Sequence, residues 1–154
     1  MELEARYACR AGEALSYNME IIVCLDDYGG MLFNSRRQSR DRLLIEDIIS
    51  NLGDKKLYIY EYSQILFEAY EGKYEITDDF FAINDDNCIC FIENIDVKPY
   101  IDQISAVTVY NWNRVYPREL VFDINLEKEG FSLMSSREFK GYSHDKIRKE
   151  VYER

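Results

Sequence analysis

The sequence predicts an α/β protein with a mixed, mostly parallel central sheet, helices on both faces and an antiparallel hairpin at its C-terminal end. Three apolar runs are typical of strands buried on both faces: residues 19–26, 88–92 and 106–112. Segments with helical spacing alternate with the predicted strands, which indicates crossover connections between parallel strands. The chain ends on two strand-like segments, 131–139 and 146–154, which we expect to pair as the hairpin.

The first strand, residues 19–26, leads into a turn, because DDYGG at residues 26–30 contains two glycines. The stretch NSRRQSRDR, residues 34–42, then places four arginines in nine residues of an acidic chain. We expect this stretch to form a loop that ends at a helix.

That helix is predicted over residues 42–52, RLLIEDIISNL, because its apolar residues recur at helical spacing. Ser39 is expected to cap it, since a serine hydroxyl can accept a hydrogen bond from the free N–H groups of a first turn. Gly53 suits the position just past its end, where many helices need a left-handed residue.

The remaining elements continue the alternation of strands and helices. Strands are expected at residues 56–62, 73–77, 88–92, 106–112 and 120–124. One helix is expected at residues 63–72, between a capping Ser63 and a terminating Gly72. A second is expected at residues 99–104, because Pro99 suits a first helical turn.

The composition is that of a globular protein, with 154 residues, 47% of them hydrophobic and 31% charged. We expect residues 19–154 to form a single domain and residues 1–18 to form an N-terminal extension with a helix-compatible sequence. The sequence has no apolar run of membrane-spanning length and no signal-peptide core at residues 1–18. These features predict a cytoplasmic protein that does not cross a membrane.

The charge balance is strongly acidic, with 29 Asp and Glu against 19 Lys and Arg and a net charge of -10. Proteins that bind nucleic acid present a basic face to the phosphates, so this balance disfavours a nucleic-acid partner. It favours a basic protein partner instead.

Cysteine and histidine content argues against a metal site. Cys9, Cys24, Cys88 and Cys90 form no CxxC pair, and His144 is the one histidine of the chain. We expect buried, reduced thiols. We expect His144, in GYSHDK, to be exposed in a hairpin turn and to have no catalytic role.

Five stretches follow one another in an order that resembles a known family. MEIIVCLDDYGGMLFN, RDRLLIEDI, KLYIYEYSQIL, CICFIEN and AVTVYNW resemble successive parts of the dihydrofolate reductase family, over nearly all of residues 19–154. They are similar to its first strand and glycine loop, its acid-bearing helix, its phosphate-binding turn, its strand ending in Gly-Gly and the strand after it. Two further stretches, RELVFDINLEKEGFSLMS and HDKIRKEVYER, resemble the family's acidic segment with the strand that follows it and the family's final strand. The resemblance implies a dihydrofolate-reductase-like three-layer fold and an oxidoreductase that uses NADPH.

The resemblance also implies cofactor-binding positions, several of which depart from the family. The family's Gly-Gly is replaced by Glu93 and Asn94, and a side chain at Glu93 would crowd and repel a pyrophosphate. Glu61 replaces a basic residue of the phosphate-binding turn, while Ser63 keeps a hydroxyl there. The positions carried over as cofactor-binding are Gly29, Gly30, Tyr62, Ser63, Glu93, Asn94 and Tyr100. NADPH is therefore implied by the resemblance and disfavoured by the missing glycines.

By the same resemblance, Asp41 is the catalytic, substrate-binding acid, which in the family supports protonation of a bound pterin. The alternative is that Asp41 complements the helix dipole from the first turn. Tyr110 lies where the family has a small hydroxyl residue that faces the acid. It is expected to bind substrate by a hydrogen bond or to pack in the core. Trp112 follows at the edge of the sheet where ligands bind.

The arginine stretch supplies further substrate-binding candidates: Arg36, Arg37, Ser39 and Arg40. Planar guanidinium groups suit bidentate capture of a carboxylate or a phosphate, here beside a helix N-terminus. The alternative is a solvated loop whose arginines pair with the chain's surplus of acids.

Three functions are consistent with these observations. The first is a diverged dihydrofolate-reductase-like protein that acts as an NADPH-dependent oxidoreductase or binds a small anionic or nucleotide ligand. The second is a non-catalytic acidic binding protein, of inhibitor or immunity type, that recognises a basic protein. The third is an enzyme with new chemistry that holds a phosphorylated or carboxylated substrate with residues 36–41.

Overall fold

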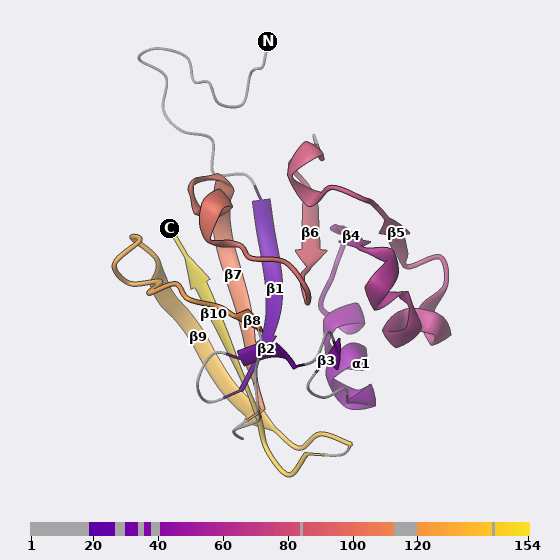
Figure 1. Ribbon diagram of the computed structural model, residues 1–154. Coiled ribbons are helices and arrows are strands. Elements are labelled where there is room, and N and C mark those ends of the chain that lie inside the picture. Colours follow the sequence, from indigo (N-terminus) through magenta and orange to yellow (C-terminus); the bar gives the residue numbers. More distant parts are fainter. Residues whose placement is uncertain are drawn as a thin grey trace.

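The chain is arranged around one large sheet, with a smaller sheet beside it (Figure 1). The computed structural model describes residues 19–26, 30–33, 36–37, 41–83, 85–112, 120–142 and 144–154, with the backbone alone for residues 32, 33, 36 and 37. The predicted extension at residues 1–18 therefore lies outside the described residues.

The strands follow the order that the sequence predicts, with two additions. Their bounds are β1 (Met19–Leu25), β2 (Gly30–Phe33), β3 (Arg36–Arg37), β4 (Lys56–Ile59), β5 (Tyr74–Ile76), β6 (Cys88–Phe91), β7 (Ile104–Asn111), β8 (Leu120–Val121), β9 (Ser132–Phe139) and β10 (Ile147–Glu153). The helical segments are α1 (Arg42–Ser50) and three 3-10 segments, η1 (Glu61–Tyr70), η2 (Phe80–Ala82) and η3 (Lys98–Gln103).

The large sheet has the strand order β5-β4-β6-β1-β7-β10-β9. The pairs β5 with β4, β4 with β6, β6 with β1 and β1 with β7 are all parallel. β10 runs antiparallel to both β7 and β9. This arrangement confirms the predicted mixed, mostly parallel sheet with a C-terminal antiparallel hairpin.

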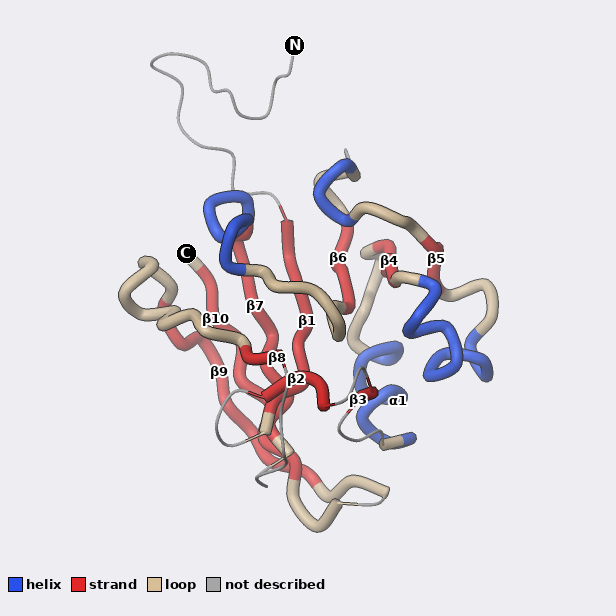
Figure 2. The backbone as a smooth tube through the Cα atoms, in the orientation of Figure 1, coloured by secondary structure: helices blue, strands red, loops and turns tan. Residues whose placement is uncertain are grey.

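The sheet separates two hydrophobic cores, which explains the continuous apolar runs of its central strands. In β1, Ile21 and Val23 belong to one core and Ile22 to the other. Leu44 and Ile48 of α1 and Phe67 of η1 pack into the second core with Ile22. The segments η2 and η3 cover the first core, and Figure 2 shows the helical segments distributed around the sheet. The expected helices on both faces are therefore confirmed.

The smaller sheet, β3-β2-β8, was not predicted. It occupies part of the stretch expected to be a turn and a loop, and in Figure 1 it lies near the arrowhead end of β1. Gly30 begins β2, and the pairing of β2 with β8 joins segments about ninety residues apart in the sequence. A local pattern does not encode such pairing, because these strands are two to four residues long.

Several element boundaries differ from those predicted by one to three residues, and the clearest case lies around Tyr60. The strand expected at residues 56–62 ends at Ile59, and the helix expected from Ser63 begins at Glu61 as a 3-10 segment. Tyr60 lies between the two elements, and its ring stacks on Phe80 with the ring centroids 3.9 Å apart. The cap of α1 is Asp41, whereas the predicted cap, Ser39, lies outside the described residues.

No helix in the described part of the chain is long and apolar enough to span a membrane.

Candidate functional site

The carboxyl ends of β4, β6, β1 and β7 lie side by side, and this is the edge at which open α/β sheets bind ligands. The chain leaves these strands through Tyr60, Ile92, Asp26 and Trp112. Most of the predicted site residues lie in or just after these segments, or at the start of α1. The polar contacts along this edge therefore decide what it can bind.

Ser63 and Glu93 meet between the ends of β4 and β6. The Ser63 hydroxyl donates a 2.7 Å hydrogen bond to Oε1 of Glu93, and both side chains are buried. Burial first, and the charge of Glu93 second, raise the pKa of the nearby Cys24 thiol well above its usual value. Cys24 therefore remains a protonated thiol beside a buried carboxylate, and the hydroxyl predicted to face a cofactor phosphate faces Glu93.

Asp41 caps α1 and also holds the turn between β9 and β10. Its Oδ1 accepts hydrogen bonds from the backbone N–H groups of Leu43 (2.9 Å), Leu44 (3.4 Å) and Tyr142 (2.8 Å). Its Oδ2 lies 3.0 Å from Nδ1 of His144, and its side chain has 0% of its surface exposed. The carboxylate therefore caps the helix and is closed off from solvent by the protein's own groups.

The expectation that His144 is exposed is wrong. Its side chain is buried against Asp41 and stacks on the Trp112 ring, with the ring centroids 4.5 Å apart. His144 is buried because the turn between β9 and β10 packs against the N-terminus of α1, a contact between distant parts of the sequence. Gly141 permits this approach, since a Cβ there would lie 2.5 Å from Oδ2 of Asp41.

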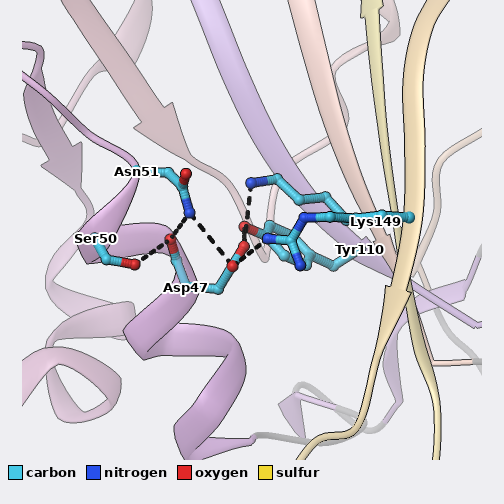
Figure 3. Close-up of polar contacts among 6 residues, drawn as sticks. Asp47, Ser50, Asn51, Tyr110 and Lys149 are labelled. Atoms are coloured by element: carbon cyan, nitrogen blue, oxygen red, sulfur yellow. Dashed lines mark hydrogen bonds and ion pairs between the residues drawn. The ribbon is translucent and has the colours of Figure 1, made fainter.

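Tyr110 is fully buried, and its hydroxyl donates a 2.6 Å hydrogen bond to Oδ2 of Asp47. Asp47, in α1, also accepts from Lys149 of β10 at 3.1 Å and from Arg137 of β9 (Figure 3). Of the two expectations for Tyr110, the structure places the residue in the core, and its hydroxyl is bonded to an acid of α1 that the sequence analysis did not single out.

Asp47 is the residue that sequence reasoning missed. Burial alone would raise its pKa, but hydrogen bonds from Tyr110, Arg137 and Lys149 outweigh burial and leave the pKa below its usual value. Burial and the Asp47 carboxylate together raise the pKa of Tyr110. One signal was available, because Asp47 lies three residues after buried Leu44 and so borders the apolar face of the helix.

The other predicted residues have mixed placements. Gly30 donates its backbone N–H to Oδ1 of buried Asp26 at 2.7 Å and so closes the turn after β1. Tyr100 stacks on Phe81 with centroids 3.8 Å apart. Tyr62 and Asn94 are half-buried. Gly29, Ser39 and Arg40 lie outside the described residues, and the side chains of Arg36 and Arg37 are not described.

A groove lies between α1 and η1, beside buried Asp41. Its volume is about 640 Å³, and its lining includes Arg42, Ile45, Glu46, Ile65, Glu68 and Tyr142. A second hollow of about 490 Å³ follows η1 and shares Ile65 and Glu68 with the groove. A third, of about 630 Å³, lies on the opposite face of the sheet and is lined by Asp26, Asp123, Glu127 and Glu150 among others.

The lining of all three hollows is more acidic than basic, because Arg42 is the one basic side chain among their described residues. Such surfaces favour cationic over anionic ligands. In the part of the chain that the structure describes, no group of His, Cys, Asp and Glu side chains could hold a metal ion.

The strand order and the two-sided cover of the sheet define an α/β protein with a dihydrofolate-reductase-like fold. A solved structure with the same architecture is dihydrofolate reductase from Enterococcus faecalis, complexed with NADP(H) and RAB-propyl. The two share a TM-score of 0.60 and 7% sequence identity, over 88% of this chain and 95% of that one. At this identity the likeness shows the fold. No family model and no curated protein matches the chain.

Proposed function

We propose that this chain is a non-catalytic binding protein on a dihydrofolate-reductase-like fold, which recognises a basic protein and works without a nicotinamide cofactor. The observation that carries the proposal is the hydrogen bond between Ser63 and Glu93. It puts a buried carboxylate next to the hydroxyl that the resemblance assigns to a phosphate.

The residues at this position do not fit a dinucleotide phosphate. A phosphate near Ser63 would have to displace Glu93 from its hydrogen bond or lie beside a second negative charge. Like charges at such distances repel strongly where water is excluded. Glu93 also replaces a glycine of the family, so its side chain occupies volume that the cofactor would need.

The position of Asp41 supports the same conclusion. A substrate-binding acid must be reachable, whereas this carboxylate accepts three backbone hydrogen bonds, contacts His144 and has no exposed surface. A substrate could reach it only by breaking the cap of α1. The charge of -10 and the acidic hollows then favour a basic partner.

The second candidate is an NADPH-dependent oxidoreductase or a binder of a small anionic ligand. It is favoured by the likeness to a reductase whose solved structure contains NADP(H). It requires that Glu93 turn away and that Asp41 become accessible, two rearrangements that a binding protein does not need.

Titration with NADPH separates the two candidates. A saturating ligand at 100 times its dissociation constant stabilises a protein by about 2.7 kcal/mol, which thermal unfolding detects. We expect no stabilisation of the unaltered protein by millimolar NADPH and no change in Trp112 fluorescence. The Glu93→Gln variant is the matched control. It removes the negative charge that would repel the NADPH phosphates and keeps the shape of the side chain. Saturable binding of NADPH to the unaltered protein would reject the proposal.

A further inference from the structure

We infer that the groove between α1 and η1 is the partner-binding surface, and that its occupant is an extended segment of the partner in which lysine or arginine alternates with apolar residues. The inference rests on the proposed function and adds the site and the chemistry of the bound segment. It is carried by the shape of the groove, its exposed apolar side chains and its charge.

The groove offers apolar surface that the fold itself does not cover. Ile45 and Leu66 contribute to its wall, while Ile65 is 50% exposed and Tyr142 is 65% exposed at its rim. Exposed large apolar side chains gathered at one concave surface are characteristic of interaction sites. Tyrosine is also among the residues that contribute most to binding at protein interfaces.

The negative charge of the groove favours a bound segment with basic side chains. Glu46 and Glu68 line it, and Glu61 and Glu71 continue the acidic lining along the second hollow. Within the described part of the chain, these four carboxylates have no ion-pair partner. The guanidinium of Arg42 lies 4.2 Å from the centre of the Tyr142 ring, so the one basic group of the groove is held at its edge.

The form of the surface favours an extended segment over a compact ligand. The two hollows share Ile65 and Glu68 in their linings, so they lie next to each other along η1. Along an extended chain, successive side chains point in opposite directions, so alternating basic and apolar residues can meet carboxylates and apolar wall in turn. Nucleic acid is disfavoured as the occupant of this groove, because its phosphates would face these carboxylates.

The test is the binding of a fluorescein-labelled peptide of alternating lysine and leucine, measured by fluorescence anisotropy at low salt. We expect saturable binding to the unaltered protein and none by a peptide of alternating glutamate and leucine. The double variant Glu46→Gln, Glu68→Gln should weaken binding at least tenfold. Ile65→Ser should weaken it about fivefold, because it removes apolar contact and leaves the charge unchanged.

The matched control removes two charges from the opposite face of the sheet, with Asp123→Asn and Glu127→Gln. It should weaken binding less than twofold, and all variants should keep the thermal unfolding temperature of the unaltered protein. Equal weakening by both double variants, or no binding by the unaltered protein, overturns the inference. The proposed function has a separate test. It fails if NADPH binds saturably to the unaltered protein, whatever the peptide does.

Discussion

Oδ2 of Asp41 lies 3.0 Å from Nδ1 of His144, across 103 positions of the sequence. The contact joins the N-terminus of α1 to the turn between β9 and β10, so it locks the acid-bearing helix to the C-terminal hairpin. Both side chains are buried, and neither is available to a ligand without local opening. The geometry makes the pair a structural anchor, and the first two predictions concern its stability.

Two replacements of Asp41 should show how much its hydrogen bonds and how much its charge contribute to the free energy of unfolding. Asp41→Ala leaves the N–H groups of Leu43, Leu44 and Tyr142 without their acceptor, so we expect a loss of about 3 kcal/mol in the free energy of unfolding. Asp41→Asn keeps an oxygen acceptor and should cost less than half as much. Urea unfolding followed by circular dichroism measures both. A loss below about 0.5 kcal/mol for Asp41→Ala contradicts the anchor.

Gly141 should tolerate no side chain in this packing. An alanine Cβ there would lie 2.5 Å from Oδ2 of Asp41 and 2.6 Å from Cδ1 of Ile147. We expect Gly141→Ala to cost about 1–3 kcal/mol, as overpacking does. Ile147→Val removes the clashing Cδ1, so the double variant should be more stable than the sum of the single losses predicts. Additive losses in urea unfolding would show that the Ile147 contact is not the cause.

Asp47 should make stability depend on pH in the acid range. Its folded-state pKa lies below the unfolded value of about 3.9, so the unfolded state binds more protons and stability is lost as pH falls through the folded pKa. We expect Asp47→Asn to be less stable than the unaltered protein at pH 7, by about 1–2 kcal/mol from its lost charged hydrogen bonds. The difference should shrink below about pH 4. Exposed Asp54→Asn is the control, and a difference that does not change with pH contradicts the prediction.

Tyr110 should give the opposite dependence at alkaline pH. Its folded-state pKa is raised, chiefly by burial and then by Asp47, so stability is present below the unfolded value of about 10 and is lost as pH rises above it. Tyr110→Phe should cost about 1 kcal/mol at pH 7, because it removes the hydrogen bond to Asp47. The cost should decrease above about pH 10. Tyr142→Phe, at an exposed position, serves as the control in the same urea titrations.

Much of the fold could be predicted because its strongest signals are local. The apolar runs of β1, β6 and β7 have no polar face, and only burial on both sides of a sheet accommodates them. The apolar spacing of α1 likewise required one buried helix face. The short strands β2 and β3 escaped prediction because their pairing, rather than their own pattern, makes them strands. The strand expected at residues 120–124 exists as β8, but its pairing with β2 was not foreseen.

The candidate site was predictable in part. Glu93 was identified as a departure from a cofactor site and Ser63 as a retained hydroxyl, but their direct contact was not foreseen. Tyr110 was expected to bind substrate or to pack in the core; it is buried in the core, and its hydrogen bond to Asp47 was not foreseen. His144 was expected at the surface, since a single polar residue in a turn gives no sign of the ring that covers it.

The sequence by itself determined the longer strands of the large sheet and the buried face of α1, because apolar periodicity is a property of neighbouring positions. Only the tertiary structure decided which buried polar groups meet. Glu93 and Ser63 are 30 positions apart, Tyr110 and Asp47 are 63, and His144 and Asp41 are 103. A hydrogen bond forms only within a few tenths of an ångström of its ideal distance, and the packing of distant elements sets that distance. The same packing puts Glu93 beside the hydroxyl that a cofactor phosphate would need.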